Sequence, residues 1–237
     1  MSLEINPIEI DCKNLRIERQ KENNKILLQY ILEKNHKKIL ENCNELELNR
    51  TIQYLEINFE DILNKCDIDI IFAKLLVSKI SKNASRQGTK DEIFILDKCN
   101  ETTKKIGIKI EKLSQIAYRP SKLGKILNHK EVKKAKLNKI DCLKSFDGKI
   151  SGKCNGWIFS KIVFTAGGHQ DNVFEEAYQL CEWVETFEKK DKTLYALIID
   201  TDLEKSLNDL RNKYKNNKNI FIGNHIDFQR YLIKKYN

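Results

Sequence analysis

The chain has 237 residues, enough to bury a substantial core, and its hydrophobic content of 41% excludes general disorder. Its 43 basic and 34 acidic residues give a net charge of +9, which favours a polyanionic partner, with DNA or RNA as the first candidate. The alternative is that an AT-rich genome, which encodes Lys, Ile and Asn freely, accounts for the charge alone.

The seven cysteines are scattered without a CxxC or CxxH spacing. This argues against a disulfide framework and against a structural zinc site. The polar start MSLEINPIEIDCKNL has no apolar segment of the signal-peptide type, and no apolar run approaches transmembrane length. We therefore expect a soluble protein of a reducing compartment, the cytoplasm of a bacterium.

Residues 23–84 carry apolar side chains at three- and four-residue spacings, as in Ile26, Leu27, Tyr30 and Ile31, which predicts a series of helices. We expect a helical N-terminal region over residues 1–105, packed on the core so that the whole chain forms one compact domain. Its role would be that of a layer beside a sheet or of a dimer contact.

A short polar segment, Ser85–Lys90, precedes Asp91 and Glu92, two acids that suit the first turn of a helix. Arg and Gln side chains make two-pronged contacts to base edges, and Lys reaches phosphates. The segment is thus a candidate for DNA contact, although an ordinary surface joint is the alternative.

Residues 106–139 have a mixed character. Ile106–Ile110 alternates as a short strand does, and Tyr118–Lys125 is expected to be a loop with several cations. The segment His129–Lys139 holds five lysines and could form a basic helix along a phosphate backbone or a solvated face.

From Leu143 onward, strand and helix patterns alternate. The predicted strands are 157–165, 194–199 and 220–222, and the predicted helices are 173–187, 203–214 and 228–235. This order predicts an α/β core over residues 106–237, with a mixed central sheet flanked by helices on both faces.

The chemistry is expected in the middle of this core. Asp147 opens a predicted hairpin, and Lys161 lies within an otherwise apolar strand. A lone ammonium is costly to bury, so Lys161 needs an explanation, and metal-dependent cleavage of nucleic acid supplies one. The alternative is a lysine on an edge strand that reaches solvent. A loop, Gly167–Asn172, follows, and then a helix with Glu175 and Glu176.

This order resembles the PD-(D/E)xK nuclease superfamily, specifically the type II restriction endonucleases, over about residues 143–200. Phe146-Asp147 would stand for Pro-Asp, and Phe159-Ser160-Lys161 for (D/E)xK. Phe159 departs from the family pattern because it cannot bind metal.

Some restriction enzymes supply the second carboxylate from the following helix, which makes Glu175 and Glu176 the candidates here. The family spacing favours Glu175, whereas helical periodicity favours Glu176, and both stay open. For Glu175 the alternative is a capping box in which Asn172 caps the helix.

The resemblance implies a restriction-endonuclease-like fold and Mg²⁺-dependent hydrolysis of double-stranded DNA at a specific sequence, with Mn²⁺ as a substitute, by a homodimer. The implied catalytic residues are Asp147, Lys161, Glu175 and Glu176, of which the three acids would bind the metal. The candidate DNA-binding residues are Arg86, Gln87, Lys90, Lys149, Lys153, His169, Gln170, Asp171 and Asn172.

Two alternatives remain at this point. The missing acid at Phe159 is compatible with a nucleic-acid-binding protein that has a nuclease-like fold and no catalysis. An RNA-processing nuclease would share the same site residues.

Overall fold

The computed structural model describes residues 5–84, 88–114, 117–164, 168–187 and 192–237. The chain divides into two compact units rather than the single domain expected. Residues Asp11–Gly88 form one, here called the helical unit, and Met1–Ile10 together with Thr89–Asn237 form the other, here called the core unit. The helical unit ends at Gly88, whereas the helical region was expected to run to residue 105.

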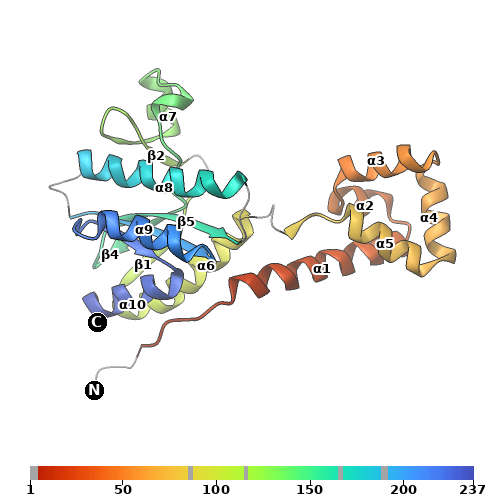
Figure 1. Cartoon of the computed structure of the whole chain (residues 1–237), viewed down its shortest axis with the longest axis horizontal. Coiled ribbons are helices and arrows are strands. Elements are labelled where there is room, and N and C mark those ends of the chain that lie inside the picture. The colour runs from red at the N-terminus through yellow and green to blue at the C-terminus, as the bar shows by residue number, and fades with distance from the viewer. Residues whose placement is uncertain (1–4, 85–87, 115–116, 165–167, 188–191) are drawn as a thin grey trace. The chain divides into compact units, whose positions relative to one another are not determined.

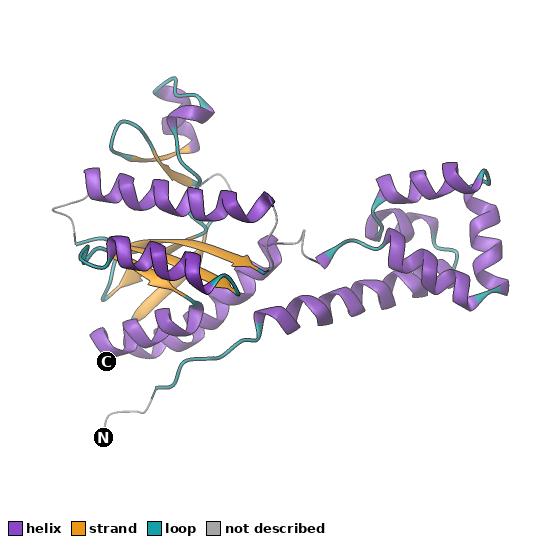
Figure 2. Cartoon of the chain, in the orientation of Figure 1, coloured by secondary structure: helices purple, strands orange, loops and turns teal. Residues whose placement is uncertain are grey.

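The helical unit contains the helices that the apolar spacing predicts: α1 (Cys12–Leu32), α2 (His36–Asn42), α3 (Glu45–Leu55), α4 (Phe59–Ile68) and α5 (Ile70–Ile80) (Figure 2). Their polar joints supply caps. The side chains of Asn35, Asn58 and Asp69 accept hydrogen bonds from backbone N–H groups in the first turns of α2, α4 and α5. Buried Leu27, Ile31, Ile62 and their neighbours form a separate hydrophobic core.

The core unit is built on a five-stranded mixed sheet, which confirms the predicted fold class. Its strands are β1 (Ile108–Lys112), β4 (Gly148–Gly152), β5 (Gly156–Val163), β6 (Leu194–Thr201) and β7 (Ile220–Gly223), in the spatial order β1-β4-β5-β6-β7. The pairs β1–β4 and β4–β5 are antiparallel, whereas β5–β6 and β6–β7 are parallel.

Helices cover both faces of this sheet, as the alternation of patterns predicts (Figure 1). On one face lie α8 (Gly168–Phe187) and α9 (Glu204–Tyr214), whose apolar side chains form one core cluster with Phe146, Phe159 and Tyr195. On the other lie α6 (Gly88–Thr103) and α10 (His225–Tyr236). Strand β6 is buried from Leu194 to Asp200, as expected for a strand covered on both faces.

The connection between β1 and β4 is a long insertion. It holds a two-stranded hairpin of β2 (Tyr118–Pro120) and β3 (Ile126–Asn128), then α7 (His129–Lys134) and the short 3₁₀ turn η3 (Lys139–Asp141). We call residues 118–141 the hairpin arm. The expected loop at 118–125 therefore begins as a strand, and the basic helix is shorter than the segment 129–139.

Residues 8–10 fasten the N-terminal segment to α10. The side chain of Gln229 exchanges two hydrogen bonds with the backbone of Ile8, at 2.8 and 3.0 Å, and Ile10 N donates to His225 Nε2 at 3.0 Å. Because Nε2 accepts, the ring proton lies on Nδ1, which donates to Asp200 Oδ1 at 2.6 Å. These contacts tie residues 8–10 to the core unit.

Among the described residues, no helix is both long and apolar enough to span a membrane.

Candidate active site

The topology brings the end of β1, the start of β4 and the first turn of α6 together at one end of the sheet. In the register of β1 with β4, Lys112 lies opposite Gly148, so the end of β1 lies beside Asp147. Helix α6 runs back along β1, since Asn100 Oδ1 accepts from Ile110 N and Thr89 O accepts from Lys112 Nζ. The first turn of α6 therefore lies at the same end of the sheet as the start of β4.

Three side chains meet there over short distances. Lys161 Nζ lies 2.6 Å from Glu92 Oε1 and 3.0 Å from Asp147 Oδ2. Asp147 Oδ2 also accepts a hydrogen bond from Ser160 N at 2.8 Å, which fixes the carboxylate against β5. The side chains are only 13–15% exposed, so these ion pairs are largely withdrawn from water.

A second lysine completes the group. Lys112 Nζ lies 3.8 Å from Glu92 Oε2, and its side chain is 20% exposed. We call Glu92, Lys112, Asp147 and Lys161 the acid–lysine cluster. Two acids and two lysines compensate one another in charge, which explains how four ionisable groups can share a poorly hydrated place.

The close charges and the burial of the cluster shift the pKa values of Glu92 and Lys161. Burial, and then the negative charge of Asp147, raise the pKa of Glu92, although Lys161 and Lys112 oppose this. Burial by itself lowers the pKa of Lys161, but the charges of Asp147 and Glu92 and their hydrogen bonds outweigh it, so that the pKa lies above its ordinary value. Lys161 is therefore firmly protonated at neutral pH.

Glu92 is the site residue that the sequence analysis missed. It was noted only as an acid suited to the first turn of a helix. A signal was present, however, because Glu92 lies three and four positions before the buried Ile95 and Leu96, on the apolar stripe of α6. An acid on a buried stripe needs a partner, and Lys161 is that partner.

Phe159 occupies the motif position at which the family has an acid. Its side chain is 2% exposed and belongs to the core cluster beneath α8 and α9. Lys161 Nζ lies 5.2 Å from the centre of the Phe159 ring. A carboxylate at this position would be buried among apolar side chains, so the fold requires an apolar residue here.

The structure does not bring Glu175 or Glu176 to Lys161. Glu176 pairs with Lys144 at 3.4 Å. Glu175 is exposed and lines a shallow hollow between α8 and α9 with Tyr178 and Leu203. The two carboxylates that contact Lys161 in the structure are Asp147 and Glu92, and Glu92 comes from the helix that precedes the sheet rather than from the one that follows Lys161.

The predicted loop Gly167–Asn172 is also corrected, because α8 already begins at Gly168. Asn172 is exposed inside the helix and does not cap it, which removes the capping-box interpretation of Glu175. The side chains of His169, Gln170 and Asp171 lie outside the described part of the structure.

The other candidate DNA-binding residues are dispersed. Lys90, in the first turn of α6, is exposed, whereas Arg86 and Gln87 lie outside the described residues. Lys149 is exposed on β4, with Nζ 5.6 Å from the Trp157 ring, and Lys153 donates to the backbone carbonyl of Tyr236 at 3.2 Å.

The donor set of the acid–lysine cluster fits a hard divalent cation. Carboxylate oxygens are the ligands that Mg²⁺ and Mn²⁺ prefer. Asp147 Oδ2 and Glu92 Oε1 contact Lys161, and Glu92 Oε2 lies 3.8 Å from Lys112 Nζ, so a bound ion would share these carboxylates with the two lysines. Burial, and then the charge of Asp147, raise the pKa of Glu92, and a bound cation would offset the second of these causes.

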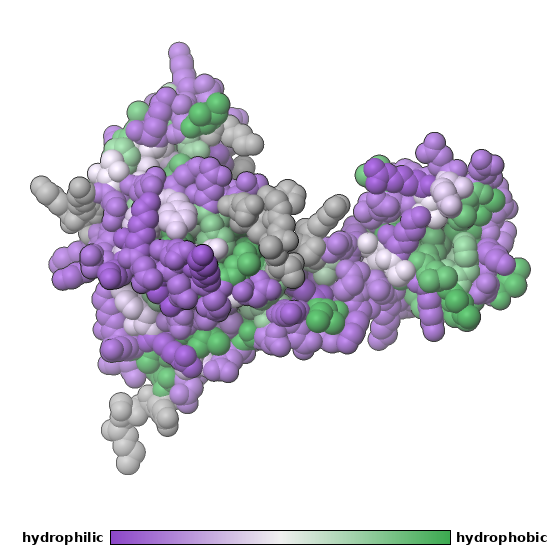
Figure 3. Space-filling model, viewed as in Figure 1, coloured by the Kyte–Doolittle hydropathy of each residue, from purple (hydrophilic) through white to green (hydrophobic). Residues whose placement is uncertain are grey.

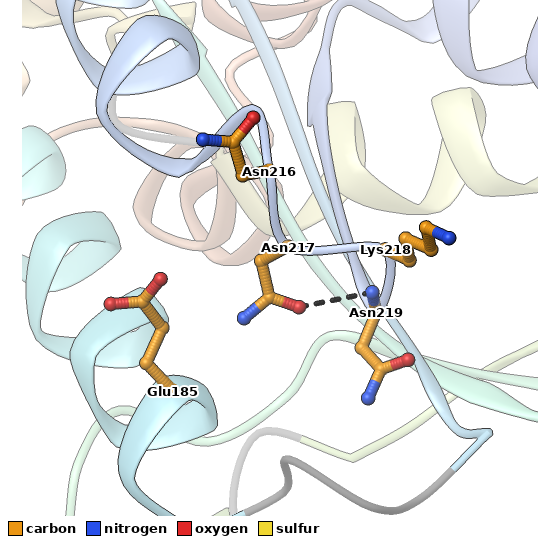
Figure 4. A pocket seen from close by; sticks show the side chains of 5 residues that line it. All are labelled: Glu185, Asn216, Asn217, Lys218 and Asn219. Carbon is orange, nitrogen blue, oxygen red and sulfur yellow. Dashed lines mark hydrogen bonds between the residues drawn. The ribbon is translucent and has the colours of Figure 1, made fainter.

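A separate hollow lies between Glu185 of α8 and the loop that enters β7 (Figure 4). Asn216, Asn217, Lys218 and Asn219 line it, and Asn217 Oδ1 accepts from Asn219 N at 3.0 Å. This loop precedes β7, whereas the acid–lysine cluster lies where β5 ends, at the opposite end of the parallel strands. The hollow is lined mainly by asparagine amides, so we place the candidate chemistry in the cluster.

Comparison of the chain with protein-family models, with curated proteins and with solved structures finds no match. The candidate active site therefore rests on its own geometry.

Proposed function

We propose that the protein is a Mg²⁺-dependent endonuclease that hydrolyses phosphodiester bonds of double-stranded DNA at a specific sequence, as a type II restriction enzyme does. The observation that supports this most is the placing of Lys161 between Asp147 and Glu92 at one end of a mixed sheet. Two carboxylates and a lysine are the groups that metal-dependent phosphodiester hydrolysis uses.

Each residue of the cluster has a distinct part in this proposal. Asp147 and Glu92 hold the cation, which supplies positive charge at the scissile phosphate when bound. Lys161 lies between the two acids and would donate a hydrogen bond to a phosphate oxygen at the reacting centre. Lys112 holds Glu92 in place and adds a second positive charge.

The alternative of a nucleic-acid-binding protein without catalysis depended on the missing acid at Phe159. Glu92 weakens that alternative, because it provides a carboxylate 2.6 Å from Lys161 by another route. A nuclease that processes RNA would have the same cluster, and competition between duplex DNA and structured RNA separates it from the DNA enzyme.

Incubation of the purified protein with a long DNA of known sequence, with Mg²⁺ and with EDTA in parallel, tests the proposed function. We expect discrete fragments that require Mg²⁺, and their ends give the recognition sequence. A smear would indicate a nuclease without sequence preference. Intact DNA in every condition tested, including Mn²⁺, would contradict the proposal.

We propose that a second copy of the chain supplies a second active site, so that each copy cuts one strand of the duplex. The helical unit offers an apolar surface around α4 and α5 for this contact (Figure 3). Ile71 and Leu75 lie one turn apart on α5 and are 68% and 64% exposed, and Ile68 at the end of α4 is 84% exposed. Exposed apolar surface of this kind commonly marks an interface.

Replacing Ile71 and Leu75 together by Asp is expected to convert a dimer into a monomer, because burying two carboxylates in the interface is unfavourable. The molar mass in solution, measured by light scattering during size-exclusion chromatography, should fall by half. Ile17→Asp serves as the control, since Ile17 is 48% exposed on α1 and outside this surface. A wild-type protein that stays monomeric with duplex DNA present would contradict the dimer.

A further inference from the structure

The positive charge of the chain is concentrated in the hairpin arm. Eight of the 24 residues from 118 to 141 are basic and two are acidic. A tenth of the chain thus carries two-thirds of its net charge of +9. Lysine and isoleucine codons spread over a whole genome do not explain a local concentration of this kind.

The cations of the arm are available to a partner. Helix α7 contains no buried residue, and Lys130, Lys133, Lys134 and Lys136 are exposed. Its acid, Glu131, turns back to accept a hydrogen bond from Asn128 N at 2.7 Å, as part of a capping box. Within the described ranges, none of these four lysines forms an ion pair. Their charges therefore remain uncompensated.

The arm is fixed to the core unit and is not a loose tail. Trp183 Nε1 in α8 donates to Ser121 O at 2.8 Å, and Phe146 N donates to Tyr118 O at 2.9 Å. The ring of Tyr118 lies 5.1 Å from that of Trp157 in β5. The turn of the hairpin fits closely against α8, since a Cβ added to Gly124 would lie 2.5 Å from the ring of Phe187.

The same anchoring ties the arm to the candidate active site. Asp147 lies six positions after Asp141, the last residue of the arm. Between them, Leu143 N donates to Pro120 O, and the Phe146 ring stacks on Trp157 at 5.2 Å. A group bound on the arm is therefore held at a fixed place relative to Asp147.

Two apolar side chains stand among the cations. Leu123 is 53% exposed and Ile140 is 97% exposed. The turn that carries Ile140 is fixed, because Asn138 N donates to Asp141 Oδ2 at 2.8 Å and Lys122 Nζ donates to Asp141 Oδ1 at 2.6 Å. Proteins that bind the minor groove frequently insert apolar side chains between base steps.

We propose that the hairpin arm is a binding surface for the phosphate backbone of duplex DNA, which it holds beside the acid–lysine cluster. The inference rests on the proposed function for the identity of the nucleic acid. It assigns to the arm the affinity that does not depend on sequence, which comes from lysine–phosphate contacts and the release of counterions.

A pair of matched variants tests the arm. The arm variant replaces four exposed lysines by Gln: Lys130, Lys133, Lys134 and Lys136. The control variant makes the same change in net charge on the helical unit, at the exposed lysines Lys13, Lys25, Lys37 and Lys74. Circular dichroism melting checks that both variants fold, which we expect because no buried side chain is altered.

Binding is measured with the full chain and a fluorescein-labelled DNA duplex of about 30 base pairs, in EDTA and over a series of salt concentrations. For the arm variant we expect a loss of roughly tenfold or more at low salt, and a slope of log Kd against log salt that is smaller by about 0.9 for each phosphate contact removed. The control variant should resemble the wild type.

Equal losses in both variants would overturn the proposal, because they would reflect net charge alone, and so would an arm variant with wild-type affinity. Tighter binding of duplex RNA than of DNA would overturn the choice of partner. Since binding is measured in EDTA, the result does not depend on cleavage. Arm-dependent binding without any cleavage in Mg²⁺ would leave this inference standing while the proposed function fails.

Discussion

Glu92→Gln is expected to reduce Mg²⁺-dependent DNA cleavage by about 10²–10³-fold or more, a loss of the size seen when one group that stabilises transition-state charge is removed. The Gln side chain has the same length and can still accept a hydrogen bond from Lys161, so the fold is kept. It cannot supply an anionic oxygen to a cation. Single-turnover cleavage of a duplex that contains the mapped site measures the effect.

Glu175→Gln and Glu176→Gln are the matched controls for this experiment. Glu175 is exposed, and Glu176 pairs with Lys144, so both variants should cleave at the wild-type rate. Loss of cleavage in Glu176→Gln with full activity in Glu92→Gln would contradict the assignment of the second carboxylate.

Metal binding gives a second measurement that does not need a substrate. Binding of Mg²⁺ or Mn²⁺ to the folded state alone stabilises it by about 2.7 kcal/mol when the ion is at 100 times its Kd. This stabilisation should be lost in Glu92→Gln. In the wild type it should weaken as the pH falls through the raised pKa of Glu92, at a higher pH than an ordinary glutamate would give, because protons and the cation compete for the same carboxylate.

A local sequence pattern identifies only those residues of the acid–lysine cluster that lie close together along the chain. Asp147 and Lys161 could be predicted because both lie in the strand pattern of one hairpin. Glu92 could not be paired with Lys161, since 69 positions separate them and only the return of β1 along α6 brings them together. Glu175 and Glu176 were favoured by their sequence separation from Lys161. That separation does not determine the direction in which their side chains point from α8.

Sequence patterns likewise predicted the long elements of the fold better than the short ones. Strand β6 was predicted correctly because its continuous apolar run is too short for a typical helix and suits a strand buried on both faces. The strands β2 and β3 were missed because they are only three residues long and depend on pairing with each other, as Arg119 does with Leu127. Gly168 was expected in a loop because glycine is a poor helix former, yet α8 begins there.

Lys161→Met is expected to abolish cleavage and also to change how the protein responds to metal. Removing one member of a buried ion pair costs about 3 kcal/mol or more, because the partner charges stay behind uncompensated. Here Glu92 and Asp147, each 13% exposed, would face each other without the lysine. Urea denaturation at neutral pH without metal should show this loss of stability.

The pH dependence of that loss follows from the carboxylates. Without Lys161 the pKa of Glu92 rises further, so the folded variant binds a proton more tightly than the unfolded chain does. The free energy of unfolding of Lys161→Met is then only slightly below that of the wild type at acidic pH. The difference grows as the pH rises through the raised pKa of Glu92. The exposed Lys149 of the neighbouring strand provides the control, since Lys149→Met leaves no buried charge uncompensated and should lower the stability far less.

Added Mg²⁺ or Ca²⁺ should stabilise Lys161→Met more than it stabilises the wild type, because the cation no longer shares the carboxylates with an ammonium group. Cleavage should nevertheless stay lost, since the variant lacks the lysine proposed to donate to the phosphate, and Lys112 stays paired with Glu92. A variant that is stable without metal and responds to it like the wild type would show that Lys161 merely extends to solvent. Greater stabilisation by metal without cleavage would separate the two tasks of the cluster, with the acids holding the cation and the lysine acting on the phosphate.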